Sequence, residues 1–350
     1  MSSPSSPSKK RRWRWGGAWL IGLAVSIALL IWVLHRINFR DVWADARQAD
    51  GLLLAITVIV ATITFPVRTF RWQLILRDAN GGRLPWAPLW HATTIGFMAN
   101  NLLPARAGEF ARAYVAARQL PGVRFSTALA SLGVERVLDG LVMLGLMAAA
   151  IAAPSFPAHA RVGGRSVSAI TTSAAVLFGI LFLIALTVVF RPAPWLRLFE
   201  RISKRLLPER VARRFGHFVE GMVAGLVVLK SPGRLTGALV WSVVLWLKNA
   251  AAFAICFKAF GIEIPLEAAL VLQAIIGFGV AIPSSPSGVG VFEAATLVTL
   301  QLYGVDSNLA VSYALTYHLT TFLPITLLGF WSLSRLHLRL GELRAEPDAA

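Results

Sequence analysis

Long apolar runs separated by short polar segments dominate this chain. Six of these runs have the length of a membrane-spanning helix, which needs about 20 mainly apolar residues. Two further apolar stretches, 86–103 and 265–282, lead directly into segments rich in proline and glycine. The pattern predicts an all-α integral membrane protein with about six transmembrane helices and two interrupted helical segments. The six predicted spans are residues 17–34, 51–67, 126–151, 166–190, 235–258 and 308–333.

The two interrupted segments are copies of one another. The sequence PARAGEF at 104–110 and the sequence PSGVGVF at 286–292 lie 182 positions apart, and the similarity continues without gaps to residue 128. Nine of these 25 positions are identical, whereas chance would give about two at this composition. Interrupted apolar segments in corresponding places of two halves indicate a transport site. The identical pairs are Pro104/Pro286, Gly108/Gly290, Phe110/Phe292, Ala113/Ala295, Gln119/Gln301, Leu120/Leu302, Gly122/Gly304, Val123/Val305 and Ala128/Ala310.

We expect the segments 86–120 and 265–303 to be re-entrant hairpins that enter and leave on one side of the membrane. The alternative is eight full crossings, which would place four charged residues in a helix over 105–120. Each charge at the centre of a lipid-facing helix costs about 2.5–3.5 kcal/mol, whereas a re-entrant helix that lines a cavity avoids most of this cost. Three crossings would separate the hairpins, so the second copy is predicted to be inverted, as in many secondary transporters.

Charge supports this topology. The net charge is +17. The basic residues are concentrated in the predicted cytoplasmic segments, so this charge does not indicate nucleic-acid binding. With the N-terminus in the cytoplasm, cytoplasmic segments hold 26 of the 34 Lys and Arg residues, as the positive-inside rule requires. We therefore expect a multi-pass protein of the bacterial inner membrane, with both termini cytoplasmic. Its predicted parts are a basic N-terminus (1–16), one membrane domain (17–335) with inverted repeats around 86–151 and 265–333, and a tail (336–350).

Two details refine this picture. The first apolar run is too long for a cleaved signal peptide and no small-residue cleavage site follows it, so it is expected to remain as an anchor. Residues 195–223 combine basic residues with apolar residues at near-helical spacing. This pattern predicts amphipathic helices on the cytoplasmic leaflet, with a solvated loop as the alternative.

Charged residues inside a predicted span are the first candidates for a binding site. Glu135, Arg136 and Asp139 lie about 14–20 Å from the start of the span 126–151, near the middle of the membrane. Arg136 and Asp139 are three residues apart and can pair on one helix face. Intramembrane charges indicate a functional site by default, although an internally neutralised structural cluster would show the same pattern.

The first copy of the repeated motif adds polar and charged residues. If a helix begins after Pro104, its positively polarised N-terminus favours an anion. Arginine is the side chain best shaped for bidentate contact with phosphate. The alternative is an interfacial cluster that anchors the helix. The candidate substrate-binding residues here are Asn100, Asn101, Arg106, Glu109 and Arg112.

The second copy offers hydroxyl groups and free backbone groups but no cation. Its candidates are Ser284, Ser285, Ser287, Gly288, Gly290 and Glu293. Glu293 is expected to pair with Arg106, Arg136 or Lys248, or to take part in ion or proton coupling. Lys248, inside the span 235–258, is a further substrate-binding candidate, although a lone lysine can snorkel to the interface. His318 lies 182 residues after Arg136 and is the histidine we select as a candidate for proton coupling, with a hydrogen-bonded structural role as the alternative.

Other chemistry has no signature in the sequence. The single cysteine, Cys256, allows no intrachain disulfide and indicates no thiol metal site. We find no metal-ligand spacing, no nucleotide-binding loop and no nucleophile motif. The sequence therefore predicts no metal, no cofactor and no enzymatic activity.

Three motifs in order resemble a known family. They are NNLLPARAGEFARAY at 100–114, LGVERVLDG at 132–140 and IPSSPSGVGVFEAA at 282–295. They resemble the transmembrane region of the lysylphosphatidylglycerol synthetases, a flippase-like family, over residues 17–335. In the aminoacyl-lipid enzymes this region is thought to move the modified lipid between leaflets, while a separate soluble domain makes that lipid. Such a domain is not expected here, because only about 15 residues follow the last predicted span.

The resemblance implies lipid translocation without lipid synthesis. It implies membrane lipids as partners, in particular an anionic or aminoacylated phospholipid, and no nucleic acid. A homo-oligomer or a partner enzyme is also compatible with it. The alternative function is that of a membrane scaffold that moves nothing itself and assists a lipid-modifying enzyme or a glycosyltransferase.

Overall fold

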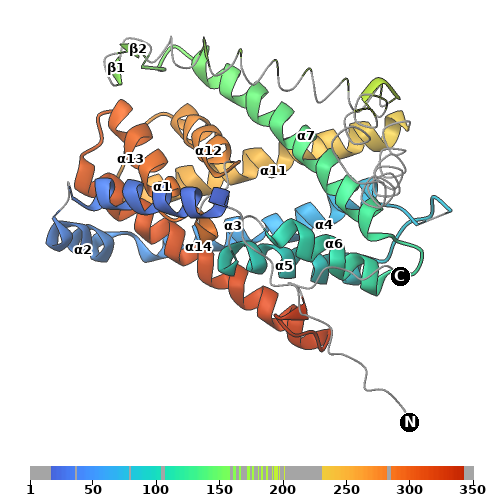
Figure 1. Cartoon of the computed structure of the whole chain (residues 1–350). Coiled ribbons are helices and arrows are strands. Elements are labelled where there is room, and N and C mark those ends of the chain that lie inside the picture. The colour runs from blue at the N-terminus through green and yellow to red at the C-terminus, as the bar shows by residue number, and fades with distance from the viewer. Residues whose placement is uncertain are drawn as a thin grey trace.

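A computed structural model describes residues 17–35, 38–78, 80–103, 107–157, 231–281 and 285–342, with scattered positions between 161 and 201. In these parts of the chain the architecture is helical, apart from the two-residue strands β1 (Arg161–Val162) and β2 (Arg165–Ser166), which pair antiparallel (Figure 1). The prediction of an all-α membrane protein is confirmed in fold class. The number of full crossings stays a prediction.

The helices form two series along the chain. The first series is α1 (Gly17–Leu34), α2 (Phe39–Gln48), α3 (Gly51–Thr62), α4 (Thr64–Ile75), α5 (Trp86–Leu102), α6 (Ala107–Gln119) and α7 (Phe125–Ile151). The second series is α11 (Pro232–Ala259), α12 (Leu266–Ala281), the 3₁₀ turn η2 (Pro286–Gly288), α13 (Val291–Leu302) and α14 (Ser307–Arg335).

Helix lengths separate possible crossings from shorter elements. Among the described residues, the continuous stretch Gly51–Ile75 and the helix Pro232–Ala259 are long and apolar enough to cross a membrane. Helices α7 and α14, with 27 and 29 residues, also exceed the length of about 20 residues that a crossing needs. By contrast, the hairpin helices α5, α6, α12 and α13 have 17, 13, 16 and 12 residues. These shorter lengths favour re-entrant hairpins.

The boundaries of the helices follow the offset of 182 seen in the sequence. Helix α7 begins at Phe125 and α14 begins at Ser307, which is the same repeat position. The turns before these two helices also match, because Gly122 and Gly304 have φ angles of 80° and 79°. The correspondence extends N-terminally, since the stretch formed by α3 and α4 corresponds to α11. Each repeat is therefore a long helical stretch, a hairpin and a second long helix.

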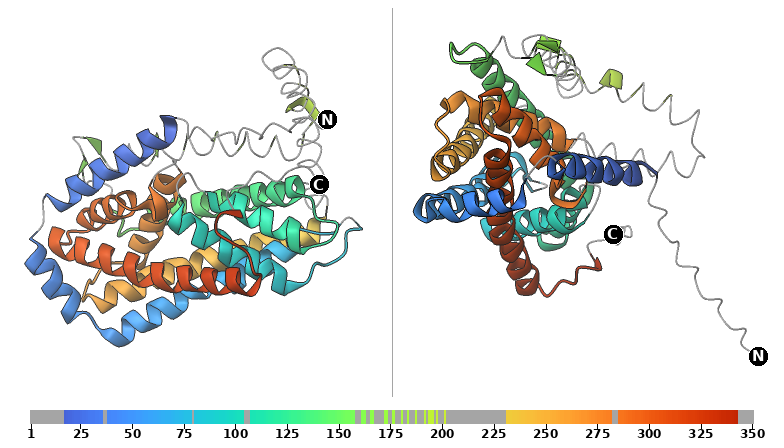
Figure 2. Two further views of the ribbon diagram at one scale, coloured as in Figure 1. Left: turned by 60° about the horizontal axis from the view of Figure 1, so that its bottom comes forward. Right: turned by 90° about the vertical axis from the view of Figure 1, so that its left-hand side faces the viewer.

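The two repeats pack reciprocally. Helix α14 lies against α5 of the first repeat, and α7 lies against the equivalent helix α12 of the second (Figure 2). Helix α11 packs along α3 and α4, its own counterparts. Reciprocal contacts of this kind are what a two-fold relation between repeats produces. Whether the axis lies in the membrane plane, as an inverted repeat requires, stays a prediction.

The glycines at one repeat position, Gly108 and Gly290, have different structural roles in the two hairpins. In the first hairpin, a Cβ atom on Gly108 would lie 1.9 Å from the carbonyl oxygen of Gly96, so only glycine allows α5 and α6 to approach this closely. In the second hairpin, Gly290 has a φ of 87°, a left-handed conformation that glycine adopts without strain. The repeated Gly108/Gly290 pair thus secures close helix packing in one copy and a sharp turn in the other.

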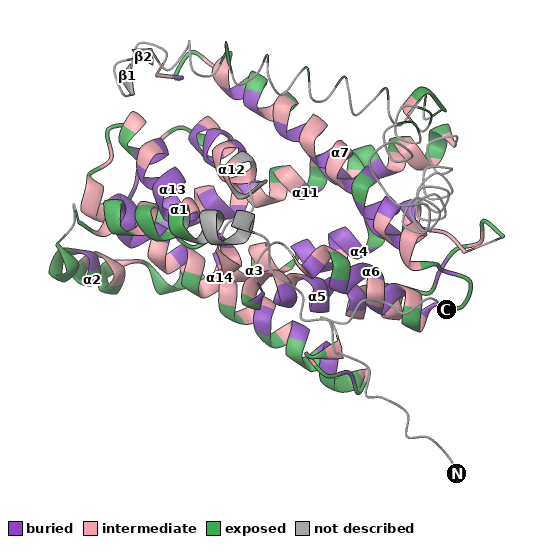
Figure 3. Cartoon of the chain, viewed as in Figure 1, coloured by how far each residue is buried: buried purple, intermediate pink, exposed green. Residues whose placement is uncertain are grey.

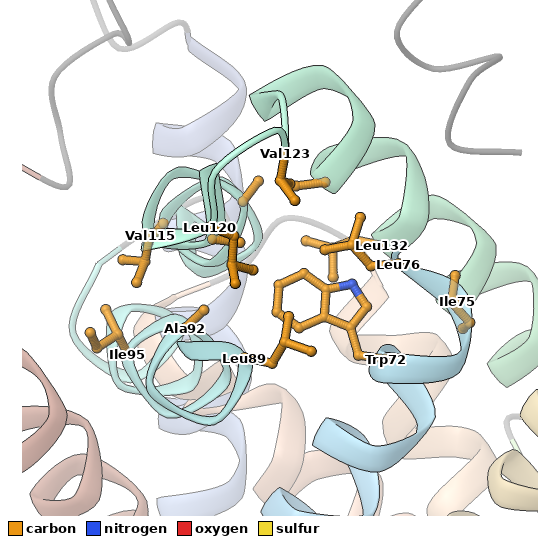
Figure 4. Close-up of a cluster of buried hydrophobic side chains, with 14 of the residues drawn as sticks. Trp72, Ile75, Leu76, Leu89, Ala92, Ile95, Val115, Leu120, Val123 and Leu132 are labelled. Carbon is orange, nitrogen blue, oxygen red and sulfur yellow. The ribbon is translucent and has the colours of Figure 1, made fainter. Parts of the chain in front are cut away.

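The two largest of the buried apolar clusters hold most of the described helices together, and Figure 3 shows the buried residues in purple. The first surrounds Trp72 of α4, whose indole ring packs among side chains of α5, α6 and α7 (Figure 4). The indole N–H of Trp72 donates to the hydroxyl of Ser131 at 2.8 Å, so the polar edge of the ring is also satisfied. The second cluster surrounds Tyr313 of α14 and includes Phe253, Phe257 and Leu297. Each cluster is built mainly from one repeat, but Ala238 and Leu333 of the second repeat join the first cluster, and Val33 and Val42 of α1 and α2 join the second.

One part of the predicted topology was wrong. The span predicted at 51–67 extends to Ile75 as α3 and α4, with a break at Ile63. Arg68 and Arg71, which the topology placed in a cytoplasmic loop, lie instead on the buried face of α4. They are tolerated there because carboxylates of α7 lie opposite them. Positive charge marks a cytoplasmic loop only where it has no buried partner.

Some predicted segments lie outside the described residues. These are the basic N-terminus at 1–16, most of the predicted span 166–190, nearly all of the amphipathic segment 195–223 and the end of the tail, 343–350.

Candidate functional site

The two copies of the motif meet at one cavity. It has a volume of about 220 Å³ and lies between α4, α5, α6, α7 and the turn η2. Three arginines and one glutamate line it, together with amides and hydroxyls. The lining residues are Arg68, Gly96, Phe97, Asn100, Asn101, Leu103, Gly108, Glu109, Arg112, Arg136, Ser285, Ser287 and Gly288.

A buried ion network lies behind the arginine side of the cavity. Arg71 is fully buried, and its guanidinium contacts Asp139 and lies 3.4 Å from Glu135. Arg112 donates to Glu135 at 2.7 and 3.4 Å, and its guanidinium lies 3.8 Å from the centre of the Trp72 ring. Buried charges persist only when they are paired and hydrogen-bonded, and here each carboxylate meets at least two arginines.

Asp139 is the centre of this network. It also accepts from the indole N–H of Trp246 at 2.9 Å. Its Oδ2 atom lies 3.6 Å from Arg68 and 3.7 Å from Arg136, the latter being the pairing predicted for residues three apart. Arg136 also lies 3.4 Å from Glu109 of α6. The network therefore joins α4, α6, α7 and α11.

Arg68 has two buried donor atoms without a hydrogen-bond partner among the described residues, whereas Arg71, Arg112 and Arg136 have one each. Its side chain is only 6% exposed, and its Nε and Nη1 atoms have no hydrogen-bond partner among the described residues. Aromatic rings of Phe97 and Trp246 flank it at 5.1 and 5.8 Å. A buried donor without a partner is costly, and this one lines the cavity. The guanidinium is ion-paired with Asp139 at 3.6 Å and keeps unused donor capacity beside the cavity.

The charges within this ion network do not balance. Four arginines, namely Arg68, Arg71, Arg112 and Arg136, face three carboxylates, namely Glu109, Glu135 and Asp139. Counting one charge for each group gives 4 − 3 = +1. A single negative charge would neutralise this set.

The side of the cavity formed by the second motif is lined by Ser285, Ser287 and Gly288, and the pair Glu293–His318 lies behind it. The hydroxyl of Ser287 lies 2.8 Å from Nε2 of His318, and Nδ1 of His318 lies 2.6 Å from Glu293. Glu293 also accepts from the backbone N–H of Gly290 at 2.6 Å and so caps α13. Glu293 is thus paired with His318, which was not among the partners expected for it. Ser285, the other serine of this side, donates to the carbonyl of Val289.

The structure brings most of the predicted residues together, with clear exceptions. Asn100, Asn101, Glu109, Arg112, Arg136, Ser285, Ser287 and Gly288 line the cavity, and Glu135 and Asp139 lie directly behind it. Asn100 accepts from Gly108 N–H and Asn101 donates to Thr326, so both amides also fasten the hairpin. Gly290 caps α13 beside the cavity. Arg106 and Ser284 lie outside the described residues.

Lys248 does not line the cavity. Its ammonium donates to the carbonyls of Val60 and Ala61 at 3.0 and 3.3 Å. These carbonyls lie in the last turn of α3, where helix ends leave acceptors unsatisfied. In this structure Lys248 therefore stabilises the break between α3 and α4.

Two important residues, Arg68 and Arg71, were missed from the sequence. Their spacing of three residues places them on one helix face, and apolar residues surround them. That signal could have shown that they continue the predicted span. Among the described residues, no group of three or more His, Cys, Asp or Glu side chains could hold a metal ion.

Comparison with known proteins adds the family. The family described as the lysylphosphatidylglycerol synthase TM region matches residues 19–329. The chain belongs to this family. The resemblance seen in the three motifs is therefore confirmed, and with it the assignment as a membrane protein.

Relatives of this family member are known by name in archaea. A UPF0104 membrane protein of Methanothermobacter thermautotrophicus is 26% identical over 325 residues, which cover 88% of this chain and 90% of that protein. A second UPF0104 membrane protein of the same organism is 23% identical, over 89% of this chain and 93% of that protein. Glycosyltransferase AglD of Haloferax volcanii is 27% identical over 308 residues, 79% of this chain but only 47% of that protein.

Proposed function

We propose that this protein moves an anionic lipid between the two leaflets of the membrane, with the polar headgroup in the cavity and the acyl chains in the bilayer. The observation that carries the proposal is Arg68, a buried arginine at the cavity that has two N–H donor atoms without a hydrogen-bond partner among the described residues. Arginine binds phosphate oxygens through its fixed fork of donors. A site of this kind is expensive inside a membrane protein unless it serves a ligand.

The charge of the site supports a headgroup with a single negative charge. The surplus of one positive charge within the ion network matches the one charge of a phosphodiester. Asn100, Asn101 and Ser285 offer neutral hydrogen bonds to the rest of the headgroup. An aminoacylated phospholipid fits less well, because Glu109 is the only carboxylate among the residues that line the cavity.

The packing of the repeats supports a mechanism of alternating access. The cavity lies where the hairpin of the first repeat meets η2 of the second. Helix α7 contacts the hairpin of the second repeat, and α14 contacts the hairpin of the first. If each helix moves with the hairpin that it contacts, the cavity opens first to one side of the membrane and then to the other. Movement of one repeat against the other around a fixed site is the usual mechanism of transporters built from repeats.

The topology derived from charge belongs to the same proposal. Both termini are placed in the cytoplasm, and the membrane is the inner membrane of a bacterium. The partners are membrane lipids, and a homo-oligomer or a partner enzyme is compatible with the proposal.

The test is lipid movement in proteoliposomes. Fluorescently labelled phosphatidylglycerol is reconstituted with the protein, and its exposure on the outer leaflet is followed by dithionite quenching. We expect Arg68→Gln and Arg136→Gln to slow the movement at least tenfold, because two charge-assisted contacts to a phosphate are worth about 1.5–3 kcal/mol each. The control is Arg118→Gln, since Arg118 is half-exposed and pairs with Glu342 away from the cavity. Unchanged movement in both cavity variants would contradict the proposal.

A second candidate function is that of an accessory protein. It is favoured by the similarity to a relative named as a glycosyltransferase, of which this chain spans less than half. Purified protein that moves no lipid but copurifies with a glycosyltransferase or a lipid-modifying enzyme would support this alternative.

A further inference from the structure

Three side chains of the second repeat form a relay that ends at the cavity. Ser287 lies in the turn η2, Glu293 in the first turn of α13 and His318 in α14. The Ser287 hydroxyl lies 2.8 Å from Nε2 of His318, and Nδ1 of the same ring lies 2.6 Å from Oε1 of Glu293. A hydroxyl, an imidazole and a carboxylate connected in this order are the arrangement that activates a serine nucleophile.

The carboxylate and the imidazole are held in the orientation that this role needs. The side chain of Glu293 is 2% exposed, and its second oxygen, Oε2, accepts from Gly290 N–H at 2.6 Å. The Phe292 ring packs against His318 with ring centres 4.8 Å apart. Because Glu293 accepts the proton on Nδ1, the Nε2 atom is left as the acceptor for the serine hydroxyl. His318 is thus oriented as a base toward Ser287.

Ser287 has a backbone conformation that is rare for its residue type. Its φ is 60°, and among the described residues only His337 is another non-glycine residue with a positive φ. Such outliers concentrate at active sites, where the surrounding structure imposes them. Known serine nucleophiles lie on a similarly sharp turn before a helix. Here the turn presents Ser287 to the cavity, and α13 follows directly.

We propose that Ser287 is an activated nucleophile that cleaves a carboxylic ester of an anionic lipid bound in the cavity. The class of lipid rests on the proposed function, because an arginine of the cavity holds its phosphate. The Ser287 oxygen bonds to the ester carbonyl carbon while its proton passes to Nε2 of His318. The ester C–O bond then breaks, and the leaving alcohol takes the proton from His318. Water, as the second reactant, hydrolyses the acyl-serine in the same way and releases a carboxylic acid.

The negative charge that develops on the carbonyl oxygen needs a donor. The N–H groups of Gly288, Val289 and Gly290 are engaged within the turn and by Glu293. Arg68 and Arg136 both line the same cavity. Within this proposal one cavity arginine holds the phosphate and the other stabilises the oxyanion, which is commonly a major part of such catalysis.

The sequence alone did not indicate this relay. Ser287 and Glu293 are six positions apart, and Glu293 and His318 are 25 positions apart, so no short motif contains all three. The order Ser, Glu, His along the chain is also found in the α/β-hydrolases, but the fold here is unrelated. A relay of this type is recognised by geometry rather than by position.

The test is covalent labelling of the full-length protein in detergent with a fluorophosphonate probe, in which the serine oxygen displaces fluoride from phosphorus. We expect one adduct, located on Ser287 by peptide mass spectrometry. Ser287→Ala should abolish this adduct, and His318→Gln should slow its formation at least 100-fold. The matched control is Ser307→Ala, because the Ser307 hydroxyl accepts from Gln301 at 2.9 Å at the start of α14 and is not among the residues that line the cavity. It should be labelled at the normal rate.

Two results would overturn the proposal: no adduct on Ser287 while a known serine hydrolase reacts in the same micelles, or an adduct that forms equally fast in His318→Gln. Melting curves of each variant ensure that only folded protein is compared. Lipid movement is measured separately for the unmodified protein. Labelling without lipid movement contradicts the proposed function alone, and lipid movement without labelling contradicts the nucleophile alone.

Discussion

The two repeats share a scaffold but fill the same position with opposite chemistry. In the first repeat Arg71 of α4 lies 3.4 Å from Glu135 of α7. At the equivalent positions of the second repeat, 182 residues later, Phe253 of α11 stacks on Tyr317 of α14 with ring centres 4.6 Å apart. One repeat joins its two long helices through a buried ion pair, and the other joins them through aromatic rings.

This difference indicates that the first repeat contains buried charges that the stability of the scaffold does not require. The aromatic pair holds two helices together without burying charge, so the scaffold does not require an ion pair here. Replacing a buried ion pair by apolar residues is often neutral or stabilising. Arg71 and Glu135 are therefore better explained by the cavity, whose arginines they support, than by stability.

The largest expected effect follows from breaking one of these two pairs. Arg71→Met should lower the free energy of unfolding by about 3–5 kcal/mol, because it leaves buried carboxylates without their main partner. The matched variant Phe253→Met exchanges apolar groups and should cost less than about 1.5 kcal/mol. Denaturant unfolding in detergent measures both values. Equal losses in the two variants would contradict the distinction between the repeats.

The repeated glycine gives the next effect. Gly108→Ala should cost about 1–3 kcal/mol, because its Cβ would overlap the Gly96 carbonyl and force α5 and α6 apart. Gly290→Ala should cost about 1–2 kcal/mol through its left-handed backbone alone. Thermal unfolding measures the loss of stability in both variants. The control is Gly133→Ala, whose added Cβ meets open space and should leave the stability nearly unchanged. The comparison fails if Gly108→Ala is as harmless as the control.

The smallest effect on stability is expected at Glu109. Its contact with Arg136 is 3.4 Å long and about a third exposed on both sides, so Glu109→Gln should cost about 0.2–1 kcal/mol. The same change raises the charge of the ion network from +1 to +2. Native mass spectrometry should then show more phosphatidic acid retained relative to phosphatidylglycerol than in the unmodified protein. An unchanged lipid ratio would mean that the charge balance does not select the headgroup.

Much of this architecture could be predicted from the sequence because it depends on local signals. Apolar length predicted the membrane class, and the offset of 182 located the two hairpins that meet at the cavity. Glu135, Arg136 and Asp139 stood out as charges within an apolar run. These signals need no knowledge of which helices touch.

The remainder depended on contacts that no local pattern contains. Arg68 and Arg71 resembled loop residues, since a buried arginine differs from a cytoplasmic one only by the carboxylates of a distant helix. His318 was selected from the sequence only as the counterpart of Arg136, whereas its contacts with Ser287 and Glu293 depend on the turn η2 and on the start of α13. Only the fold determines such pairings.

The hydrogen bonds from Lys248 to the carbonyls in the last turn of α3 have a consequence for the synthesis and assembly of the protein. Lys248 and the Val60 carbonyl are 188 residues apart, and Trp246 reaches Asp139 across 107 residues. Polar groups of the first repeat therefore leave the ribosome long before their partners on α11 exist. Until α11 is synthesised, the nascent first half must keep these groups hydrated or shielded by other proteins. Assembly of the membrane domain is thus completed by its second half.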